Sequence, residues 1–292
     1  MNVAVLGAGA RGRAIARSCV RAGHEVRLHD TGVETVMDGV DAVERAVGDD
    51  AGTRVDGTTD RQGAVNGADV LVDATDGSVA SRRELLADAE PLLATDPLVV
   101  TGDPRTSVTG VAAGLQAPGR AVGLSLVDPE ESALVEVVLA DQTTAATRAD
   151  AVAFVEGLDR VPIVVRDAPG FAAARLELAR IAEAIRLVEA GVTTVEGADR
   201  AATRTTDERG PLARADELGL DAVLGGLDDL HERLGDRFEP PSLLREAVEA
   251  GTLGKRTGEG FYTWSNGEPA GPGDLGSEPS AREGTEGRPD RP

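Results

Sequence analysis

The sequence predicts an α/β fold, in which a doubly wound and mostly parallel sheet is followed by an all-α second domain. Short apolar runs typical of buried strands alternate with helix-like segments over residues 1–166. After Asp167 these runs stop, and apolar residues recur at helical spacing instead. A glycine-rich turn follows the first apolar run directly. The expected domains are therefore residues 1–166 and 167–264.

The first expected strand, residues 3–6, runs into the turn Gly7-Ala8-Gly9-Ala10-Arg11-Gly12, which reads G-x-G-x-x-G. In this pattern the first glycine permits a tight turn and the second lets the backbone approach a pyrophosphate. The third lets the next helix, expected over residues 10–21, pack on the strand while its N–H groups face the anion. All six residues of the turn are therefore expected to bind a dinucleotide.

A second expected strand, residues 25–29, follows the stop at Gly23 and delivers Asp30 about 20 residues after the turn. A carboxylate at this place can accept hydrogen bonds from the ribose hydroxyls of adenosine and would repel a 2′-phosphate. The sequence therefore predicts NAD as the cofactor. The alternative is a structural glycine turn that holds no phosphate.

Further strands are expected at residues 70–74, 98–101, 121–126, 134–139 and 162–165. Ala74, Thr75 and Gly102, which end or follow two of these runs, complete the expected cofactor-binding residues.

The second domain is expected to be helical because Leu178, Ile181, Ile185 and Val188 recur at helical spacing before Gly191. Helices are also expected within residues 210–234 and 241–250. Residues 265–292 consist mainly of Gly, Pro, Ser and Glu with few apolar side chains. Such a composition cannot repay the entropy of ordering, so it predicts a disordered acidic tail.

Charge and cysteine content limit the class of protein. The formal charge is −21, from 51 acidic and 30 basic residues, and Lys255 is the only lysine. An acid-rich, lysine-poor surface suits molar salt, where screening acts within about 3 Å, and so predicts a halophilic source. It argues against nucleic acid as a partner, which needs a basic face. The lone Cys19 excludes a disulfide within the chain and is expected to be buried among apolar neighbours.

A cytoplasmic location is expected. The sequence lacks the run of roughly 18 apolar residues that a membrane span needs. Its first residues also lack the layout of a signal peptide, so neither membrane nor export is indicated.

Seven segments of the chain form a pattern when they are taken together. They are the turn at 7–12, residues 68–74, residues 121–137, Asp167-Ala168-Pro169-Gly170-Phe171, residues 183–187, Gly219-Leu220-Asp221 and residues 254–262. In order and spacing these segments resemble the 3-hydroxyacyl-CoA dehydrogenases over about residues 1–264. The resemblance implies a Rossmann-type NAD-binding domain, an α-helical dimerising domain and hydride transfer between NAD and the 3-hydroxyl of an acyl-CoA. It therefore implies a small-molecule substrate and a homodimer.

The resemblance also implies catalytic residues, and most of them are replaced here. The family uses a histidine in a G-L-H-F-x-N-P segment, a glutamate that orients it, a serine in S-N-T-S-S and an asparagine after P-G-F. This chain has Ser125 at the histidine position and Pro104 at the serine position. It has alanine after P-G-F, and only Glu136 keeps its match.

Two functions remain open from the sequence. In the first, the chain is a dehydrogenase for a 3-hydroxyacyl-CoA or a similar hydroxy acid, with Glu136 or Asp128 as the base and Ser125 as a hydrogen-bond donor. In the second, it is a catalytically silent NAD(H)-binding protein, a sensor or partner subunit that lost the Ser/His/Asn machinery. Arg82 and Arg83 are candidates for a substrate phosphate, or else form a solvated helix face.

Overall fold

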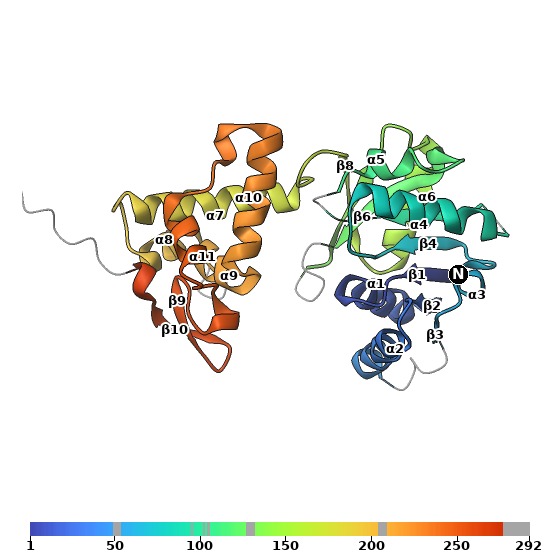
Figure 1. Ribbon diagram of the computed structural model, residues 1–292, viewed down its shortest axis with the longest axis horizontal. Coiled ribbons are helices and arrows are strands. Elements are labelled where there is room, and N and C mark those ends of the chain that lie inside the picture. Colours follow the sequence, from blue (N-terminus) through green and yellow to red (C-terminus); the bar gives the residue numbers. More distant parts are fainter. Residues whose placement is uncertain are drawn as a thin grey trace, which may run out of the picture. The chain divides into compact units, whose positions relative to one another are not determined.

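The structure is a computed structural model of the 292-residue chain. It describes residues 1–48, 54–94, 96–101, 103, 106–126, 132–203 and 209–276. The chain forms two compact units, residues 1–174 and the part that begins at Arg175 (Figure 1). The sheet unit thus includes residues 167–174, which the sequence places in the second domain. Asp167 accepts hydrogen bonds from Ser107 and Thr109, and these bonds hold the segment against the sheet unit.

The sheet unit contains eight strands in the order β3-β2-β1-β4-β5-β6-β7-β8. All neighbours pair in parallel except β6 and β7, which are antiparallel. The chain moves outward from β1 and then returns to place β4 on its other side, so the predicted doubly wound, mostly parallel sheet is confirmed. The strands are β1 (Asn2–Leu6), β2 (Glu25–His29), β3 (Val55–Thr58), β4 (Val70–Asp73), β5 (Leu98–Thr101), β6 (Ala121–Leu126), β7 (Leu134–Leu139) and β8 (Val161–Arg166).

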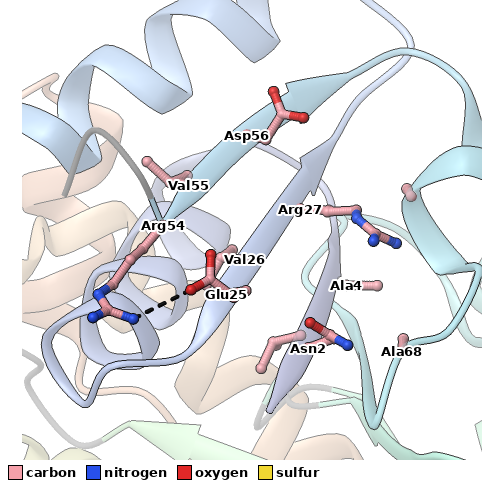
Figure 2. Close-up of a pocket in the computed structure, with 11 residues that line it drawn as sticks. Asn2, Ala4, Glu25, Val26, Arg27, Arg54, Val55, Asp56 and Ala68 are labelled. Carbon is pink, nitrogen blue, oxygen red and sulfur yellow. Dashed lines mark hydrogen bonds and ion pairs between the residues drawn. The ribbon is translucent and has the colours of Figure 1, made fainter.

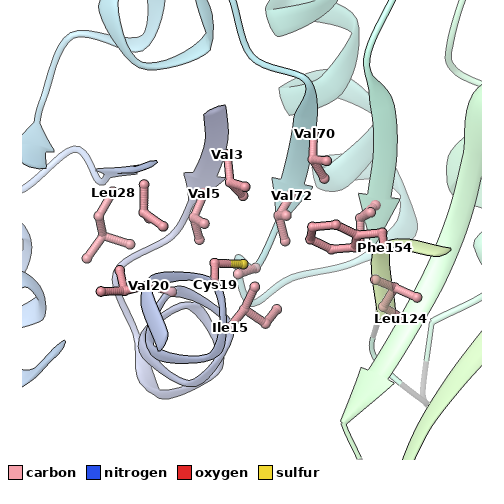
Figure 3. Close-up of a cluster of buried hydrophobic side chains, with 14 of the residues drawn as sticks. Val3, Val5, Ile15, Cys19, Val20, Leu28, Val70, Val72, Leu124 and Phe154 are labelled. Atoms are coloured by element: carbon pink, nitrogen blue, oxygen red, sulfur yellow. The ribbon is translucent and has the colours of Figure 1, made fainter. Parts of the chain in front are cut away.

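Helices cover both faces of this sheet, and each face has its own apolar core. On one face lie α1 (Ala10–Arg21), α2 (Val33–Val47) and α6 (Ala145–Gly157). Figure 3 shows Ile15, Cys19 and Val20 of α1 facing the strands, with Phe154 of α6 in the same cluster. The other face carries α3 (Arg61–Val65), α4 (Val79–Ala89) and α5 (Val108–Ala112), and the 3-10 turns are η1 (Glu90–Leu92) and η2 (Pro118–Arg120).

Strand β3 has no counterpart among the sequence expectations. It is short and contains Asp56 and Gly57, two residue types that are depleted in strands. Gly57 is required by packing rather than by strand propensity, since a Cβ there would lie 2.5 Å from Cγ1 of Val36 on α2. The close approach of α2 therefore explains why glycine occupies this position of β3, which pairs in parallel with β2.

The second unit is helical, as predicted, with a small two-stranded sheet. Ile181 and Ile185 of α7 lie fully buried in its core, beside Leu212, Leu227 and Phe261. The elements are α7 (Ala173–Glu189), α8 (Val195–Ala202), α9 (Pro211–Leu218), α10 (Leu220–Leu234), η3 (Asp236–Phe238), α11 (Ser242–Glu249), η4 (Lys255–Thr257), β9 (Tyr262–Ser265), β10 (Glu268–Pro272) and η5 (Asp274–Gly276).

The prediction that the tail begins at Ser265 is wrong, because ordered structure continues past this residue. Instead of losing order at Ser265, the chain forms a hairpin in which β10 pairs antiparallel with β9. Asn266 and Gly267 make its two-residue turn, both with positive φ, 52° and 83°. An Asn-Gly pair is strongly favoured in such turns, so this local signal overrides the apolar-poor composition. The rest of the expected tail, residues 277–292, lies outside the described residues.

Within the described chain, no helix has the length and apolar character that spanning a membrane requires.

The prediction that Cys19 is buried is confirmed, because its side chain is 0% exposed. Burial raises the pKa of the Cys19 thiol to about 12. The thiolate is the reactive form, so we expect no modification of native protein by an aromatic disulfide reagent at about pH 8. The urea-denatured chain should release one equivalent of chromophore, measured by absorbance. Rapid reaction of the native protein would contradict this burial.

Candidate functional site

The glycine-rich turn is shaped by two glycines that pack and one that does not. Gly7 has a φ of +105°, and a Cβ there would lie 2.9 Å from the carbonyl of Ala74. A Cβ on Gly12 would lie 1.9 Å from the carbonyl oxygen of Gly7. A Cβ on Gly9 would meet no atom within 4 Å. Gly9 therefore leaves the backbone open at the place where a pyrophosphate approaches the helix start, and the turn fits a dinucleotide.

Asp30, directly after β2, is hydrogen-bonded to the glycine-rich turn. Its Oδ2 accepts a hydrogen bond from Ala8 N at 3.0 Å, and its Oδ1 accepts one from Thr31 N at 2.8 Å. Burial by itself would raise the pKa of Asp30, but the N–H donors of Ala8, Thr31 and Gly32 outweigh it and hold the pKa below its usual range. The carboxylate is therefore ionised at neutral pH. It lies where it can accept hydrogen bonds from ribose hydroxyls.

The other expected cofactor residues meet at the same edge of the sheet. Ala74 packs against Gly7, and Thr75 donates its N–H and hydroxyl to Oδ1 of Asp73 at 3.0 and 2.6 Å. Ala10 begins α1. Gly102 lies outside the described residues, so its expected contact stays a prediction. Sequence reasoning missed Arg13, whose Nε donates to the carbonyl oxygen of Ala8 at 2.8 Å and supports the turn.

A buried network of charges lies beside the turn. Arg82 is fully buried, and its Nη1 lies 2.8 Å from Oδ2 of Asp73. Its Nη2 lies 3.5 Å from Oδ2 of Asp103, which is also 2.9 Å from Nη2 of Arg11. Thr101 Oγ1 donates to Oδ2 of Asp73 at 3.0 Å. These contacts join the ends of β4 and β5 to α4 and α1.

This network corrects one expectation. The side chain of Arg82 does not face solvent, and it is paired with Asp73 and Asp103. A buried guanidinium group that gave up these two carboxylate partners would carry a large energetic cost, so Arg82 is not available to a substrate phosphate. Its neighbour Arg83 is exposed, and its Nε donates to the carbonyl oxygen of Gly110 on α5.

The antiparallel register of β6 and β7 places Ser125 directly opposite Glu136. Directly opposite residues share a face of the sheet, with Cβ atoms about 4.5–5.5 Å apart. Glu136 is 1% exposed, and its Oε1 accepts hydrogen bonds from Ala172 N and Ala173 N at 2.8 and 2.9 Å. Its buried Oε2 has no hydrogen-bond partner among the described residues. Glu136 therefore has one anchored oxygen and one oxygen that can take a proton.

Two of the three catalytic candidates are thus brought together, while Asp128 lies outside the described residues. The N–H groups of Ala172 and Ala173 are functional groups that sequence reasoning did not identify. They follow Gly170 and Phe171, whose φ angles of 71° and 47° turn the chain into α7. The Pro-Gly-Phe segment signals this turn, but side-chain chemistry cannot reveal a backbone donor.

A hollow of about 210 Å³ lies at the opposite edge of the sheet, at the first residues of β1, β2 and β3 (Figure 2). Its arginines are engaged within the protein. Arg27 donates to the carbonyl oxygens of Gly63 and Asn66, and Arg54 pairs with Glu25 at 3.2 Å. Ligands of open α/β sheets bind at the carboxyl ends of the strands, so this hollow is not the cofactor site. Among the described residues, no cluster of His, Cys, Asp or Glu could hold a metal ion.

The sequence and the fold of this chain are similar to those of known proteins. Residues 2–168 match the family model described as 3-hydroxyacyl-CoA dehydrogenase, NAD binding domain, and residues 170–264 match the C-terminal domain of the same name. A probable 3-hydroxybutyryl-CoA dehydrogenase of Bacillus subtilis is 30% identical over 278 residues, covering 90% of this chain and 97% of that protein. A 3-hydroxybutyryl-CoA dehydrogenase of Mycobacterium tuberculosis is 32% identical over 287 residues, covering 90% and 98%.

Among solved structures, the (S)-3-hydroxybutyryl-CoA dehydrogenase of Ralstonia eutropha superimposes with a TM-score of 0.83 at 28% identity. The superposition covers 90% of this chain and 99% of that one.

Proposed function

The chain belongs to the 3-hydroxyacyl-CoA dehydrogenase family, and from this premise we propose that Glu136 is its proton acceptor. It is an NAD-binding oxidoreductase of this type. The proposed reaction interconverts the 3-hydroxyl and 3-keto forms of an acyl-CoA or a similar hydroxy acid. The observation that carries the proposal is the buried Oε2 of Glu136, which lacks a partner among the described residues while Oε1 is held by two N–H groups.

The chemistry divides between cofactor and protein. NAD, when bound, supplies the acceptor for the hydride that leaves the carbinol carbon. In that direction Oε2 of Glu136 takes the hydroxyl proton, and in the reverse direction it returns the proton to the carbonyl oxygen. Ser125, opposite Glu136 in the register, donates a hydrogen bond to the same oxygen as it gains carbonyl character. Ala172 and Ala173 fix the carboxylate in place.

The substrate is proposed from two observations. The two curated relatives described above are named for a 3-hydroxybutyryl-CoA, which supports an acyl-CoA. Between β2 and β3, however, the described residues form one helix, α2. The family resemblance implies a longer helical hairpin at this place, which helps to hold CoA. Acetoacetyl-CoA and free acetoacetate are therefore the two substrates to compare.

Glu136→Gln tests the proton acceptor, because the amide oxygen can still accept from Ala172 and Ala173 but the side chain no longer takes a proton. We expect consumption of NADH with acetoacetyl-CoA, followed by absorbance in about 3 M KCl, to fall by about 10²- to 10⁴-fold. NADH affinity measured by calorimetry should stay within about twofold. Glu156→Gln, an exposed change on α6, should leave both unchanged.

Full activity of the glutamine variant would show that another group is the base. Binding of NADH by the unaltered protein, with no turnover of either substrate, would favour the catalytically silent alternative.

Three further features are part of the proposal. The family resemblance supports a homodimer and a cytoplasmic location, and the charge of −21 with a single lysine supports a halophilic source.

A further inference from the structure

Arg11 stands at the third variable position of the glycine-rich turn, directly before Gly12 and in the first helical turn of α1. The start of this helix has no acidic residue and no side-chain cap at Gly9. A cation at a helix N-terminus is opposed by the helix dipole and needs an anion nearby. The backbone N–H groups of a glycine-rich turn need no such side chain to bind phosphate.

The anions around Arg11 come from the ends of two strands. Its Nη2 lies 2.9 Å from Oδ2 of Asp103, beyond β5. Its Nη1 donates to the carbonyl oxygen of Thr75 at 3.3 Å and lies 3.7 Å from Oδ1 of Asp76, both beyond β4. The guanidinium group therefore lies at the carboxyl edge of the sheet, between the turn and the loops that follow β4 and β5.

Arg11 differs from Arg82 in being partly accessible. The side chain of Arg11 is 26% exposed, whereas that of Arg82 is 0% exposed. Asp103 contacts both arginines, so it keeps a cationic partner when Arg11 turns toward another anion. Two of the five N–H donors of a guanidinium group have hydrogen-bond acceptors here among the described residues. The remaining donors can meet phosphate oxygens.

We propose that Arg11 binds the pyrophosphate of NAD and is a positioning residue for the cofactor. Its guanidinium adds a charge-assisted contact to the backbone N–H groups of the turn. Such a contact has a particular value in this chain, because a net charge of −21 repels an anionic cofactor. A partly buried contact is also screened less by salt than an exposed one. The inference depends on cofactor binding by the turn and not on Glu136 as the proton acceptor.

Arg11→Met tests this with ligands that do not react. ADP-ribose contains the pyrophosphate but no nicotinamide, and AMP lacks the second phosphate. By calorimetry at fixed salt, we expect the affinity for ADP-ribose and for NADH to fall about tenfold or more. The affinity for AMP should change by less than about threefold. Because ADP-ribose carries no reacting ring, this result is independent of whether the protein turns over a substrate.

Arg17→Met is the matched control, since it removes one arginine from the same helix about 9 Å further along it. It should leave the affinity for all three ligands unchanged. Unchanged ADP-ribose binding in Arg11→Met would overturn the proposal, as would an equal loss for AMP and ADP-ribose. If Arg11→Met does not fold, Asp103→Asn supplies the test. This substitution loosens the 2.9 Å ion pair between Asp103 and Arg11, so the affinity for ADP-ribose should stay the same or rise. A tenfold fall in the affinity for ADP-ribose would overturn the proposal.

Discussion

Asp216→Ala is expected to lower the free energy of unfolding of the helical unit by about 3 kcal/mol or more. Asp216 is 1% exposed and accepts three hydrogen bonds. Its Oδ1 accepts from Phe261 N at 2.9 Å, and its Oδ2 accepts from Tyr262 N at 2.9 Å and Trp264 Nε1 at 3.0 Å. Truncation leaves two buried backbone donors and the partly buried indole N–H of Trp264 without an acceptor, and each buried donor costs roughly 1–3 kcal/mol.

The effect is large because Asp216 belongs to a network that joins three elements. Asp199 on α8 accepts hydrogen bonds from Leu212 N and Ala213 N at the start of α9, at 2.7 and 3.0 Å. The hydroxyl of Tyr262 on β9 donates to Oδ2 of Asp199 at 3.0 Å. Tyr262 thus contacts one carboxylate with its side chain and the other with its backbone. Loss of Asp216 loosens β9 from α9 and, through Tyr262, from α8.

Urea unfolding followed by Trp264 fluorescence measures this loss, because Trp264 is the only tryptophan and lies in the helical unit. Asp228→Ala is the control. Asp228 is 46% exposed, and its ion pair with Arg245 should contribute no more than about 1 kcal/mol. Equal stabilities of the two variants would contradict the assigned role of Asp216.

The sequence predicts best where adjacent residues determine the structure. Helix α1 has the expected bounds, because a glycine turn sets its start and the apolar period continues to Arg21. The approach of Asp30 to Ala8 is equally local, since a parallel β-α-β unit brings the end of β2 next to the turn. The cofactor edge could therefore be assembled from the sequence in advance.

Long-range pairing is where sequence reasoning ends. The resemblance identifies Ser125 and Glu136 as candidates, but only the register of β6 against β7 places them opposite each other. No local pattern sets that register, because it depends on the connection between the two strands. The anchoring of Oε1 of Glu136, which leaves Oε2 without a partner among the described residues, likewise depends on backbone donors from a segment 36 residues away in sequence.

The burial of Arg82 had a signal that was overlooked. Arg82, Leu86 and Ala89 follow the spacing of one buried helix face, so the inward face of α4 includes an arginine. A charged residue on such a face requires partners, and Asp73 and Asp103 supply them from the ends of neighbouring strands. Neither partner can be assigned before the strand order is known.

Gly9→Ala and Gly12→Ala are expected to abolish tight cofactor binding for two different reasons. Gly9 has φ −70° and ψ −173°, which alanine adopts without strain, and its Cβ would meet no protein atom within 4 Å. The methyl group would instead occupy the space that phosphate oxygens need, so NADH affinity should fall about 100-fold while stability stays within about 0.5 kcal/mol. Calorimetry and thermal unfolding measure the two quantities.

Gly12→Ala should lose both affinity and stability, because its Cβ would lie 1.9 Å from the carbonyl oxygen of Gly7. Since that atom belongs to the backbone, α1 must move away from β1, and overpacking of this kind costs about 1–3 kcal/mol. Gly157→Ala in the same unit adds a methyl group in open space and should keep NADH affinity. If Gly9→Ala bound NADH like the unaltered protein, the open space beside Gly9 would not be the phosphate site. The separation of the two effects thus tests which glycine makes room for the cofactor and which one holds the helix against the sheet.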